Sequence, residues 1–380
     1  MGKSKLKIAH IAHSLGGVDI YLRLILTNLD SDKFTNMVIH GTADTSQAFL
    51  DSKGDVVKEC KTSILRNISF LNDFRSIIDT YRFFKKNRPD IIHAHSAKGG
   101  VVGKIVGQLL GIRVLYTPHA FSYLSAENKL KRKIFLIIER VLSNGNSILL
   151  ATSKSEKGRA IKEVGYKPEQ TIVFNNCIEP IALISPLTIE KTWPEQYICT
   201  VGRPSYQKNI ESMIRVLYEV KKTQTIHLVI MGVGPVSGQL ESVKNCIREL
   251  DMVKDVTLLD WTERTDIFNI INKAQFYIST SRYEGMPYAV IESLALSKPS
   301  VVSNCDGNRD LIIDGYNGFV IDNNDINNFK EKISKLLDEK ELLTELSKNA
   351  YQNYFENYNI KKNISELEAI YYKYSNISPF

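Results

Sequence analysis

The sequence predicts an α/β protein with two doubly wound units, each a parallel sheet covered by helices. First, its 380 residues exceed one ordinary domain and suggest two of roughly 150–200 residues each. Second, short β-branched runs alternate with longer helical patterns along the chain, as β-α-β units require. Third, the alternation stops at 180–196, a segment with three prolines and no clear period, and then restarts. This segment is therefore the candidate linker.

Each element follows from its local pattern. In the first half, apolar runs such as "KIAHIAH" and "DIIHAH" predict strands, and longer stretches with an apolar stripe predict helices. In 70–88 that stripe is Phe74, Ile77, Ile78 and Tyr81. The expected strands are 7–13, 36–41, 90–95, 113–119, 147–153 and 170–176, and the expected helices are 18–29, 70–88, 99–110, 126–143 and 155–164.

The second half repeats the pattern. It begins with "YICTVGR" as a strand, and a long helical tail occupies 340–374. The expected strands are 197–203, 226–232, 255–260, 274–280, 299–304 and 318–322, and the expected helices are 209–222, 238–250, 264–272, 287–297 and 326–338. Ligands of doubly wound units bind at the carboxyl ends of the strands, so we look there for functional residues.

Composition excludes several classes of protein. Apolar residues make up 43% and charged residues 24%, so each half can bury a core and disorder is not expected. No apolar run approaches the ~18 residues of a membrane-spanning helix, and the N-terminus is interpreted as a strand rather than a signal peptide. The five cysteines form no C-x-x-C pair, which fits a reducing cytoplasm without disulfides or zinc.

The net charge of +7 is unevenly distributed. Residues 1–190 hold 27 Lys and Arg against 17 Asp and Glu, whereas residues 191–380 hold 22 against 25. A basic half can meet nucleic acid, an anionic membrane or a phosphate-rich substrate, or it is simply a solvated surface. The cluster "KLKRK" at 129–133 precedes an apolar run without interleaved aromatic residues, which favours a membrane-surface element over a nucleic-acid site.

Glycines follow strands in both halves. Gly16 and Gly17 come after the first strand, where a bare backbone and a helix start can receive a phosphate; a simple tight turn is the alternative. Gly232 opens "GVGPVSG", which is similar to a dinucleotide fingerprint but departs from its G-x-G-x-x-G spacing.

Cations and histidines also lie at strand ends. Arg203 and Lys208 follow the strand that opens the second unit and suit a diphosphate, with two plain surface cations as the alternative. His119 in "YTPHAF" ends a strand of the first unit, although a lone histidine is more often structural. His93 and His95 share one strand face, but no third ligand accompanies them, so we expect a structural role rather than a metal site.

Two glutamates stand eight positions apart in "YEGMPYAVIESLAL". Pro287 suits the start of a helix, with Glu284 and Gly285 in the loop before it, and the first-turn N–H groups can receive anionic oxygens. Glu292 lies on a mostly apolar face, where a carboxylate needs hydrogen-bond partners. Ribose hydroxyls would supply them; local backbone or a lysine is the alternative.

At this segment the chain resembles the retaining glycosyltransferases of the GT-B fold, specifically family 4, also called glycosyl transferases group 1. That family's donor signature, E-x7-E, is matched from Glu284 to Glu292. Further landmarks occur in family order: the early Gly-Gly, "PDIIHAHS", "YTPHAF", "VGRPSYQKN", "IMGVGP" and "DGNRDLIIDGYNGFVI". The resemblance covers nearly the whole chain and implies two Rossmann-like domains facing each other across a cleft.

The resemblance also implies domain limits. Residues 1–182 would form an acceptor-binding domain and residues 183–360 a donor-binding domain, with a last helix at about 361–380 packing back on the first.

Some positions depart from the family pattern: Asp260-Trp261 stands where a glycine is common, and "GNRD" replaces a more usual Gly-Gly-x-x-Glu.

Roles follow from the same resemblance. Arg203 and Lys208 would bind the donor diphosphate, Glu284 the hydroxyls of the transferred sugar and Glu292 the nucleotide ribose. His119 would lie at the reacting centre. The implied catalytic residues are His119, Glu284, Arg203 and Lys208, and the implied donor-binding residues are Gly16, Gly17, Arg203, Lys208, Gly232, Glu284, Gly285, Met286, Pro287, Ala289, Val290 and Glu292.

We therefore expect a retaining, metal-independent hexosyltransferase whose donor is a nucleotide-diphosphate sugar, UDP rather than GDP, without other cofactors. The motif variants resemble bacterial transferases that build capsule, O-antigen or lipopolysaccharide units on a lipid carrier. They imply a saccharide or lipid-linked acceptor, no nucleic-acid partner, and a cytoplasmic protein that can lie on the anionic inner face of the membrane. The alternatives are a nicotinamide-dependent oxidoreductase that uses "GVGPVSG" and a non-catalytic subunit of a polysaccharide assembly complex.

Overall fold

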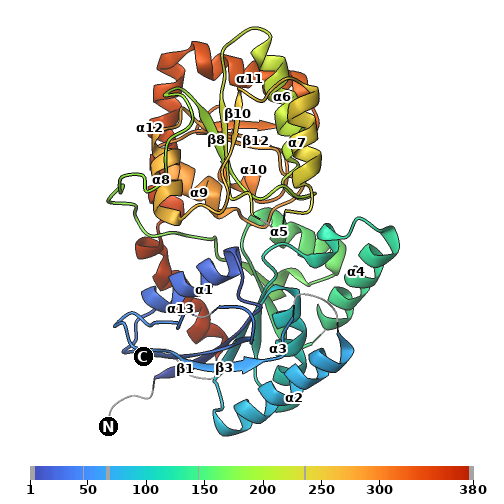
Figure 1. The fold of residues 1–380 in the computed structure, drawn as a ribbon. Coiled ribbons are helices and arrows are strands. Elements are labelled where there is room, and N and C mark those ends of the chain that lie inside the picture. Colours follow the sequence, from blue (N-terminus) through green and yellow to red (C-terminus); the bar gives the residue numbers. More distant parts are fainter. Residues whose placement is uncertain (1–4, 46, 66–68, 144, 235–236, 376–380) are drawn as a thin grey trace. The chain divides into compact units, whose positions relative to one another are not determined.

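The computed structural model describes residues 5–45, 47–65, 69–143, 145–234 and 237–375. The chain divides into two compact units, the first made of Met1–Glu179 with Ile360–Phe380 and the second of Pro180–Asn359. Each unit has its own sheet (Figure 1). Each also has its own hydrophobic core. The sequence-based limits were 182 and 360, within three residues of these.

The first unit is built on a parallel sheet with the strand order β3-β2-β1-β4-β5-β6-β7. Its central strands β1 and β4 are almost wholly buried and rich in Ile and Ala, as strands covered on both faces require. The strands are β1 (Leu6–Ile11), β2 (Phe34–Gly41), β3 (Lys58–Thr62), β4 (Ile91–His95), β5 (Val114–Thr117), β6 (Ser147–Ala151) and β7 (Thr171–Val173).

Helices cover both faces of this sheet. Figure 1 shows α2, α3 and α4 on one side and α1 with α13 on the other, as right-handed crossovers in opposite directions require. The α-helices of the first unit are α1 (Gly17–Asn28), α2 (Phe70–Lys86), α3 (Ser96–Leu110), α4 (Lys129–Ser143), α5 (Lys154–Arg159) and α13 (Ile360–Tyr374). Its shorter helical turns are η1 (Ser122–Ser125), η2 (Ala160–Val164) and η3 (Pro168–Gln170).

The second unit repeats the design with the strand order β10-β9-β8-β11-β12-β13, again parallel. Helices α6, α7 and α11 lie on one side of the sheet and α8, α9 and α12 on the other (Figure 1). The strands are β8 (Ile198–Val201), β9 (Leu228–Met231), β10 (Val256–Leu258), β11 (Tyr277–Ser279), β12 (Ser300–Ser303) and β13 (Gly318–Ile321). The helices are α6 (Ile210–Lys221), α7 (Leu240–Glu249), α8 (Arg264–Lys273), α9 (Tyr288–Ala295), α10 (Asn308–Leu311), α11 (Ile326–Asp338) and α12 (Lys340–Asn357).

The predicted fold class is confirmed, and two local predictions need correction. Strand β3 was not predicted, because "KECKT" is too polar to stand out as a strand; it lies at the sheet edge. The predicted stripe of the second helix was partly wrong, since Phe74 is 63% exposed whereas Ser76 and Thr80 are buried. Helix α2 thus presents an aromatic side chain to solvent.

Glycines allow α3 to lie unusually close to the sheet that carries β4. A Cβ on Gly99 would come within 2.3 Å of the Ile11 carbonyl oxygen, and one on Gly103 within 2.7 Å of the Ala94 Cβ. Such distances are far below van der Waals contact, so the four-residue spacing of these glycines sets the helix position. The helix begins directly after His95 and fixes the end of β4.

The linker predicted at 180–196 contains no helix or strand but is anchored to the second unit. Thr188 donates from its backbone N–H and its hydroxyl to the Asp266 carboxylate, at 2.8 and 2.6 Å. The Asn269 side chain donates to the Ser185 carbonyl at 2.7 Å. Helix α8 therefore holds the segment in place.

Candidate functional site

The main candidate site of the second unit lies at the carboxyl ends of β8 and β11, which are neighbours in the sheet. The turn at 202–209 leaves β8 and leads into α6, and the loop at 280–287 leaves β11 and leads into α9. Parallel neighbouring strands end at the same edge, so these two loops meet.

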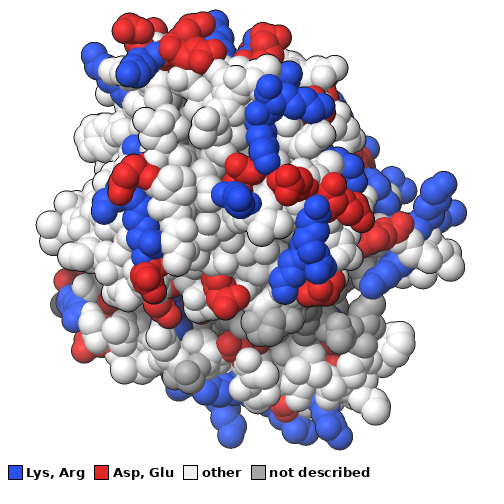
Figure 2. All heavy atoms as spheres, turned by 45° about the horizontal axis from the view of Figure 1, so that its top comes forward, with Lys and Arg blue, Asp and Glu red and all other residues white. Residues whose placement is uncertain are grey.

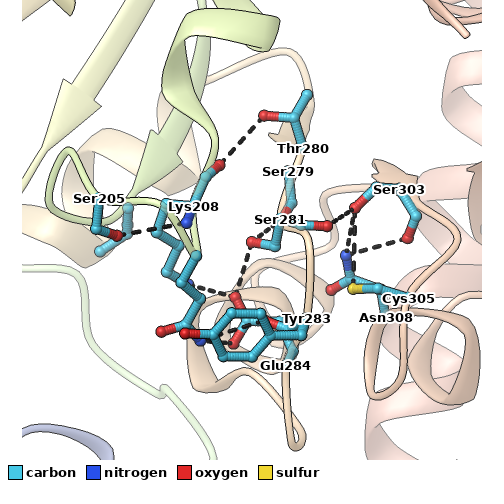
Figure 3. A network of polar contacts seen from close by, with 12 residues as sticks. Ser205, Lys208, Ser279, Thr280, Ser281, Tyr283, Glu284, Ser303, Cys305 and Asn308 are labelled. Atoms are coloured by element: carbon cyan, nitrogen blue, oxygen red, sulfur yellow. Dashed lines mark hydrogen bonds and ion pairs between the residues drawn. The ribbon is translucent and has the colours of Figure 1, made fainter. Parts of the chain in front are cut away.

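Their meeting point is an ion pair between Lys208 and Glu284 (Figure 3). The Lys208 ammonium donates to Oε1 of Glu284 at 2.7 Å, and the Ser281 hydroxyl donates to the same oxygen at 2.8 Å. The other oxygen, Oε2, accepts from the Gln207 side-chain amide at 3.0 Å. Glu284 is 6% exposed, so these contacts compensate a buried carboxylate.

The charge state of Lys208 follows from this pairing. Burial is the largest single effect and would lower its pKa, but the Glu284 carboxylate together with Tyr277 and Cys305 leaves the pKa raised. The side chain keeps 23% exposure. Lys208 is therefore a fixed cation at the ligand edge of the sheet, where negative charge on a ligand would be attracted to it.

Backbone contacts hold both loops in register. A Cβ on Gly202 would lie 3.0 Å from Lys208 Cε, so glycine there lets the lysine side chain lie flat across the turn. The Thr280 hydroxyl donates to the Asn209 carbonyl at 3.0 Å, which ties the end of β11 to the start of α6. The Ser303 hydroxyl donates to the Ser281 carbonyl at 2.6 Å (Figure 3). The loops that carry the lysine and the glutamate are thus held to the sheet and its helices by hydrogen bonds.

Gly307 supports the same loop from the next strand end. A Cβ there would lie 2.5 Å from the Gly285 carbonyl oxygen, and its φ of +79° also favours glycine. Gly285 and Met286 are buried against this turn, with Met286 4% exposed. The glycine of "GNRD" therefore shapes the start of α9.

The second glutamate of the pair, Glu292, is buried in α9 with 6% exposure. Arg264, the first residue of α8, donates to its Oε1 at 2.7 Å. Burial raises the pKa of Glu292, and the arginine only partly offsets the effect. The partner of this acid is therefore an arginine, neither local backbone nor a lysine, and the carboxylate remains costly to keep charged.

Pro287 precedes the first residue of α9 as its N-cap. Val290 is buried and Ala289 half-buried in the first turn. Arg203 is exposed in the turn after β8. Of these four predicted donor residues, two thus lie on the loops that meet at Lys208 and Glu284, and two lie in the helix turn that follows.

The glycine loop after β9 lies beside an exposed aromatic side chain. Gly232 has a φ of +86° and donates its N–H to the Asp260 carbonyl at 3.3 Å. Trp261, which follows Asp260 in the sequence, is 79% exposed. In "GVGPVSG", residues 235–236 lie outside the described residues, and α7 begins only at Leu240.

In the first unit, the predicted glycines and histidine also end strands. Gly16, with a φ of +58°, is the N-cap of α1, and Gly17 is its first residue; both are exposed. His119 follows β5 with a φ of +53°, and the Ala120 N–H donates to the buried Glu156 carboxylate at 2.8 Å. Burial lowers the pKa of His119 to about 3, so its ring is neutral near pH 7.

The prediction that no third potential ligand accompanies His93 and His95 was wrong. His10 of β1 joins them, and one ring nitrogen of each histidine lies within 4.8 Å of the others. Every ring nitrogen of the three already has a hydrogen-bond partner. The partners include Tyr371 of α13, whose hydroxyl lies 2.7 Å from His93 Nδ1. The cluster is thus a satisfied polar network in the sheet.

Helix α4 carries an exposed apolar stripe next to its basic N-terminus. The stripe consists of Leu130, Ile134, Ile137, Ile138 and Val141, which are 39–68% exposed and share one helix face. Lys129, Lys131, Arg132 and Lys133 beside it are also exposed. Figure 2 shows basic and acidic side chains interspersed on the face in view, without a large area of one sign. Among the described residues, no helix is long and apolar enough to cross a membrane.

Sequence reasoning missed several residues of these sites. Gln207, Ser281 and Arg264 hold the two glutamates, and His10 completes the histidine cluster. Of these, only Gln207 had an available signal, because it adjoins Lys208 in a turn already expected to bind a ligand.

Family models match both units. Residues 15–180 match Glycosyltransferase Family 4, and residues 189–353 match Glycosyl transferases group 1. The two matches together cover most of the chain and agree with the units of the structure.

Individual proteins resemble most or nearly all of the chain. An Escherichia coli UDP-Gal:alpha-D-GlcNAc-diphosphoundecaprenol alpha-1,3-galactosyltransferase is 28% identical over 97% of both chains. The Escherichia coli O-antigen biosynthesis glycosyltransferase WbnH is 26% identical over 71% of this chain and 73% of its own. The Anabaena Alr3699/HepE structure in complex with UDP and glucose has a TM-score of 0.77 and 19% identity, covering 96% of this chain and 100% of that one. The protein therefore has the GT-B fold and belongs to the family 4, group 1 glycosyltransferases.

Proposed function

We propose that this glycosyltransferase moves a hexose from a UDP-sugar to a lipid-linked saccharide diphosphate during the synthesis of a bacterial surface polysaccharide, with retention at the anomeric carbon and without a metal. The Lys208–Glu284 pair at the ligand edge of the second unit is the observation that carries this proposal. A relative of nearly equal length whose name specifies UDP-Gal and a diphosphoundecaprenol acceptor supports the choice of substrates.

Lys208 supplies charge to the leaving group. Its ammonium has three N–H bonds and donates one to Glu284, so up to two remain for phosphate oxygens. As the bond between the sugar and the diphosphate breaks, charge grows on the phosphate, and a preorganised cation lowers the barrier most at that point. Arg203, exposed in the same turn, is the second cation of the proposal.

Glu284 binds a hydroxyl of the transferred sugar. Its carboxylate accepts from Lys208, Ser281 and Gln207, and a carboxylate has about four acceptor positions. A hydroxyl of the transferred sugar would take the position that remains. The ion pair thus presents an acceptor for the sugar and a donor for the phosphate side by side.

Glu292 and Trp261 would hold the nucleoside. The raised pKa of Glu292 shows that burial opposes its charged form and that Arg264 offsets this only in part, so ribose hydroxyls that donate to it would be favourable. Trp261, exposed beside the Gly232 loop, offers a flat apolar face to the base. An aromatic ring in place of the family's common glycine is then part of base recognition.

The proposed step needs no strong protein base. The bond between the anomeric carbon and the diphosphate oxygen breaks, and the acceptor oxygen forms its bond to the same face of that carbon. The acceptor proton passes to the departing diphosphate, which has gained the electron pair of the broken bond. The products are the α-linked saccharide and UDP, and atoms and charge balance without a co-reactant.

The protein would bind its acceptor at a membrane surface. The stripe of α4 buries apolar area in the lipid headgroup region while the four adjacent cations attract anionic lipid. A lipid-linked diphosphate is confined to that surface, so docking of the first unit raises its local concentration.

A transfer assay tests the proposal. The purified protein is incubated with each of UDP-galactose, UDP-glucose, UDP-N-acetylglucosamine and GDP-mannose, together with N-acetylglucosamine diphosphate on a short polyprenyl chain, with and without EDTA. We expect one UDP-sugar to be used, an α-linked product by NMR and no effect of EDTA. A β-linked product contradicts retention, a loss with EDTA contradicts metal independence, and GDP-mannose use contradicts the donor. Activity only on free saccharides contradicts the acceptor.

A further inference from the structure

Four of the seven histidines of the chain lie together in the first unit. His10 is on β1, His93 and His95 are on β4, and His119 follows β5. The first three are 0% exposed, and His119 is half-buried. Such a concentration of ionisable rings inside a parallel sheet calls for a role beyond packing.

Three of the rings join head to tail. His10 Nδ1 lies 3.2 Å from His95 Nε2, and His95 Nδ1 lies 3.3 Å from His119 Nε2. At the far end, His10 Nε2 lies 3.3 Å from the Asn36 side-chain oxygen. Each link therefore joins the Nδ1 of one ring to the Nε2 of the next, and we call Asn36–His10–His95–His119 the imidazole chain.

The rings are neutral, which makes their protons interdependent. Burial lowers the pKa of His10 to about 4 and of His119 to about 3, and that of His95 well below its usual value. A neutral ring has one N–H, and each link needs one donor and one acceptor. Fixing the proton on one ring therefore fixes it on all three.

The Asn36 oxygen selects the direction. It can only accept, so His10 must carry its proton on Nε2 and accept on Nδ1. His95 then carries its proton on Nε2, and so does His119. The chain of bonds leaves Nδ1 of His119 as a bare acceptor.

We propose that Asn36, His10 and His95 are positioning residues that hold His119 in the Nε2–H tautomer, so that its Nδ1 accepts a hydrogen bond from a hydroxyl of the sugar substrate. That His119 meets the sugar rests on the proposed function, whereas the control of its tautomer does not. The backbone supports the same end: His119 has a φ of +53°, and the neighbouring Ala120 N–H is held by Glu156 at 2.8 Å. The ring is thus fixed from its backbone and from its edge.

His93 offers a matched control. It is as buried as His10 and lies beside it in the register of β1 and β4. Its nitrogens bond instead to the Tyr371 hydroxyl at 2.7 Å and the Thr117 hydroxyl at 2.9 Å. Replacing His93 therefore disturbs the same region of the core without cutting the imidazole chain.

The test is a tautomer measurement on the full chain labelled with ¹⁵N-histidine, by long-range ¹H–¹⁵N correlation at pH 7.5. In the wild type, His10, His95 and His119 should all show the Nε2–H pattern. A mixed pattern, or Nδ1–H at His119, overturns the proposal without any variant. In His10→Leu and Asn36→Leu, His119 should populate both tautomers, whereas His93→Leu should leave it unchanged. An unchanged His119 in both His10→Leu and Asn36→Leu also overturns the proposal.

Kinetics give the second readout. His10→Leu should lower kcat by about tenfold with the donor KM unchanged, the loss expected for one misdirected hydrogen bond, and His93→Leu should stay within about twofold. Equal losses in the two variants would mean that the cluster acts only through folding. If the tautomers behave as expected but the wild type transfers no sugar, the proposed function fails and the imidazole chain stands.

Discussion

Lys208 and Glu284 are 76 positions apart in the sequence, yet the lysine Nζ lies 2.7 Å from the glutamate Oε1. They come from loops after adjacent strands, and each loop was expected to bind a different part of one ligand. Because the two side chains are partners before any ligand arrives, a change in one alters the other, and single substitutions must be interpreted as changes to the pair.

Lys208→Met should abolish transfer and also destabilise the second unit. The buried Glu284 would keep Ser281 and Gln207 but lose its cation, at a cost of about 1–3 kcal/mol. Transfer should fall at least about 100-fold, because the leaving group loses a fixed charge. Steady-state assays and chemical denaturation measure the two effects. Lys222→Met, at an exposed pair with Glu219, should leave both unchanged.

The double variant Lys208→Met/Glu284→Gln separates the two effects. Without the buried charge, stability should return to near the wild-type value while transfer remains absent. If the double variant is as unstable as Lys208→Met, the uncompensated carboxylate is not the cause.

Glu292→Gln should weaken donor binding while keeping or raising the thermal stability of the protein. A carboxyl whose pKa is higher in the folded than in the unfolded chain makes folding less favourable as pH rises through that interval. The neutral amide removes this penalty, so melting at pH 7.5 should match or exceed that of the wild type, while the donor KM rises about tenfold with the loss of a charged acceptor. Glu241→Gln, at an exposed site on α7, is the control. A lower melting temperature with an unchanged KM would assign Glu292 to structure alone.

Trp261→Ala should weaken donor binding without affecting the fold. The side chain is 79% exposed, so little packing is lost, whereas stacking on a base is worth about 1–3 kcal/mol. Calorimetric titration with UDP should show a loss of about five- to 100-fold. Val253→Ala, also exposed in the second unit, should bind UDP normally. Equal affinities for the two variants would remove the tryptophan from the site.

Stability of the first unit should fall below pH 6.5. His10 has a pKa of 6.5 in the unfolded chain and about 4 in the folded protein, so the unfolded chain takes up the proton first. Each pH unit within this window then costs about 1.4 kcal/mol for that histidine. Denaturation at pH 7.5, 6 and 5 should show a shallower pH dependence for His10→Leu than for the wild type. Parallel curves would show that His10 does not carry the effect.

Leu130→Ser/Val141→Ser should release the protein from membranes. Both side chains are 68% exposed on the α4 stripe and would lose their apolar contact with lipid. Co-sedimentation with phosphatidylglycerol-rich vesicles at low salt should detect the wild type but not the variant, and high salt should weaken wild-type binding. Leu183→Ser/Val253→Ser, at side chains of the second unit that are 88% and 61% exposed, is the control. Failure of the wild type to bind at low salt would refute the membrane surface.

The architecture was accessible from the sequence because periodicity and strand-end motifs are local signals. Helix 326–338 was predicted to the residue, and Glu284 and Gly285 were correctly expected in a loop before a helix. The side chains that contact the two glutamates could not be predicted from the sequence, because these contacts depend on which strands and helices become neighbours. Arg264 carries no mark that sets it apart from other surface arginines, yet the pairing of α8 with α9 places it on Glu292.

The same limit applies to the histidines. His93 and His95 were identified as a strand-face pair, but His10 lies 85 positions from His95 and joins it only because β1 and β4 are adjacent. Strand β3 was missed for a different reason: an edge strand needs few apolar residues, so its composition is that of a loop.

The return of α13 to the first unit makes the second unit, in chain order, an insertion within the first. Residues 180–359 could be cloned as one uninterrupted fragment, whereas the first unit has no such fragment. A stop codon shortly before Ile360 would remove the hydroxyl of Tyr371 from His93 and leave Nδ1 of that buried ring without its partner. Loss of α13 would therefore damage the first unit, although the preceding residues in the chain belong to the second.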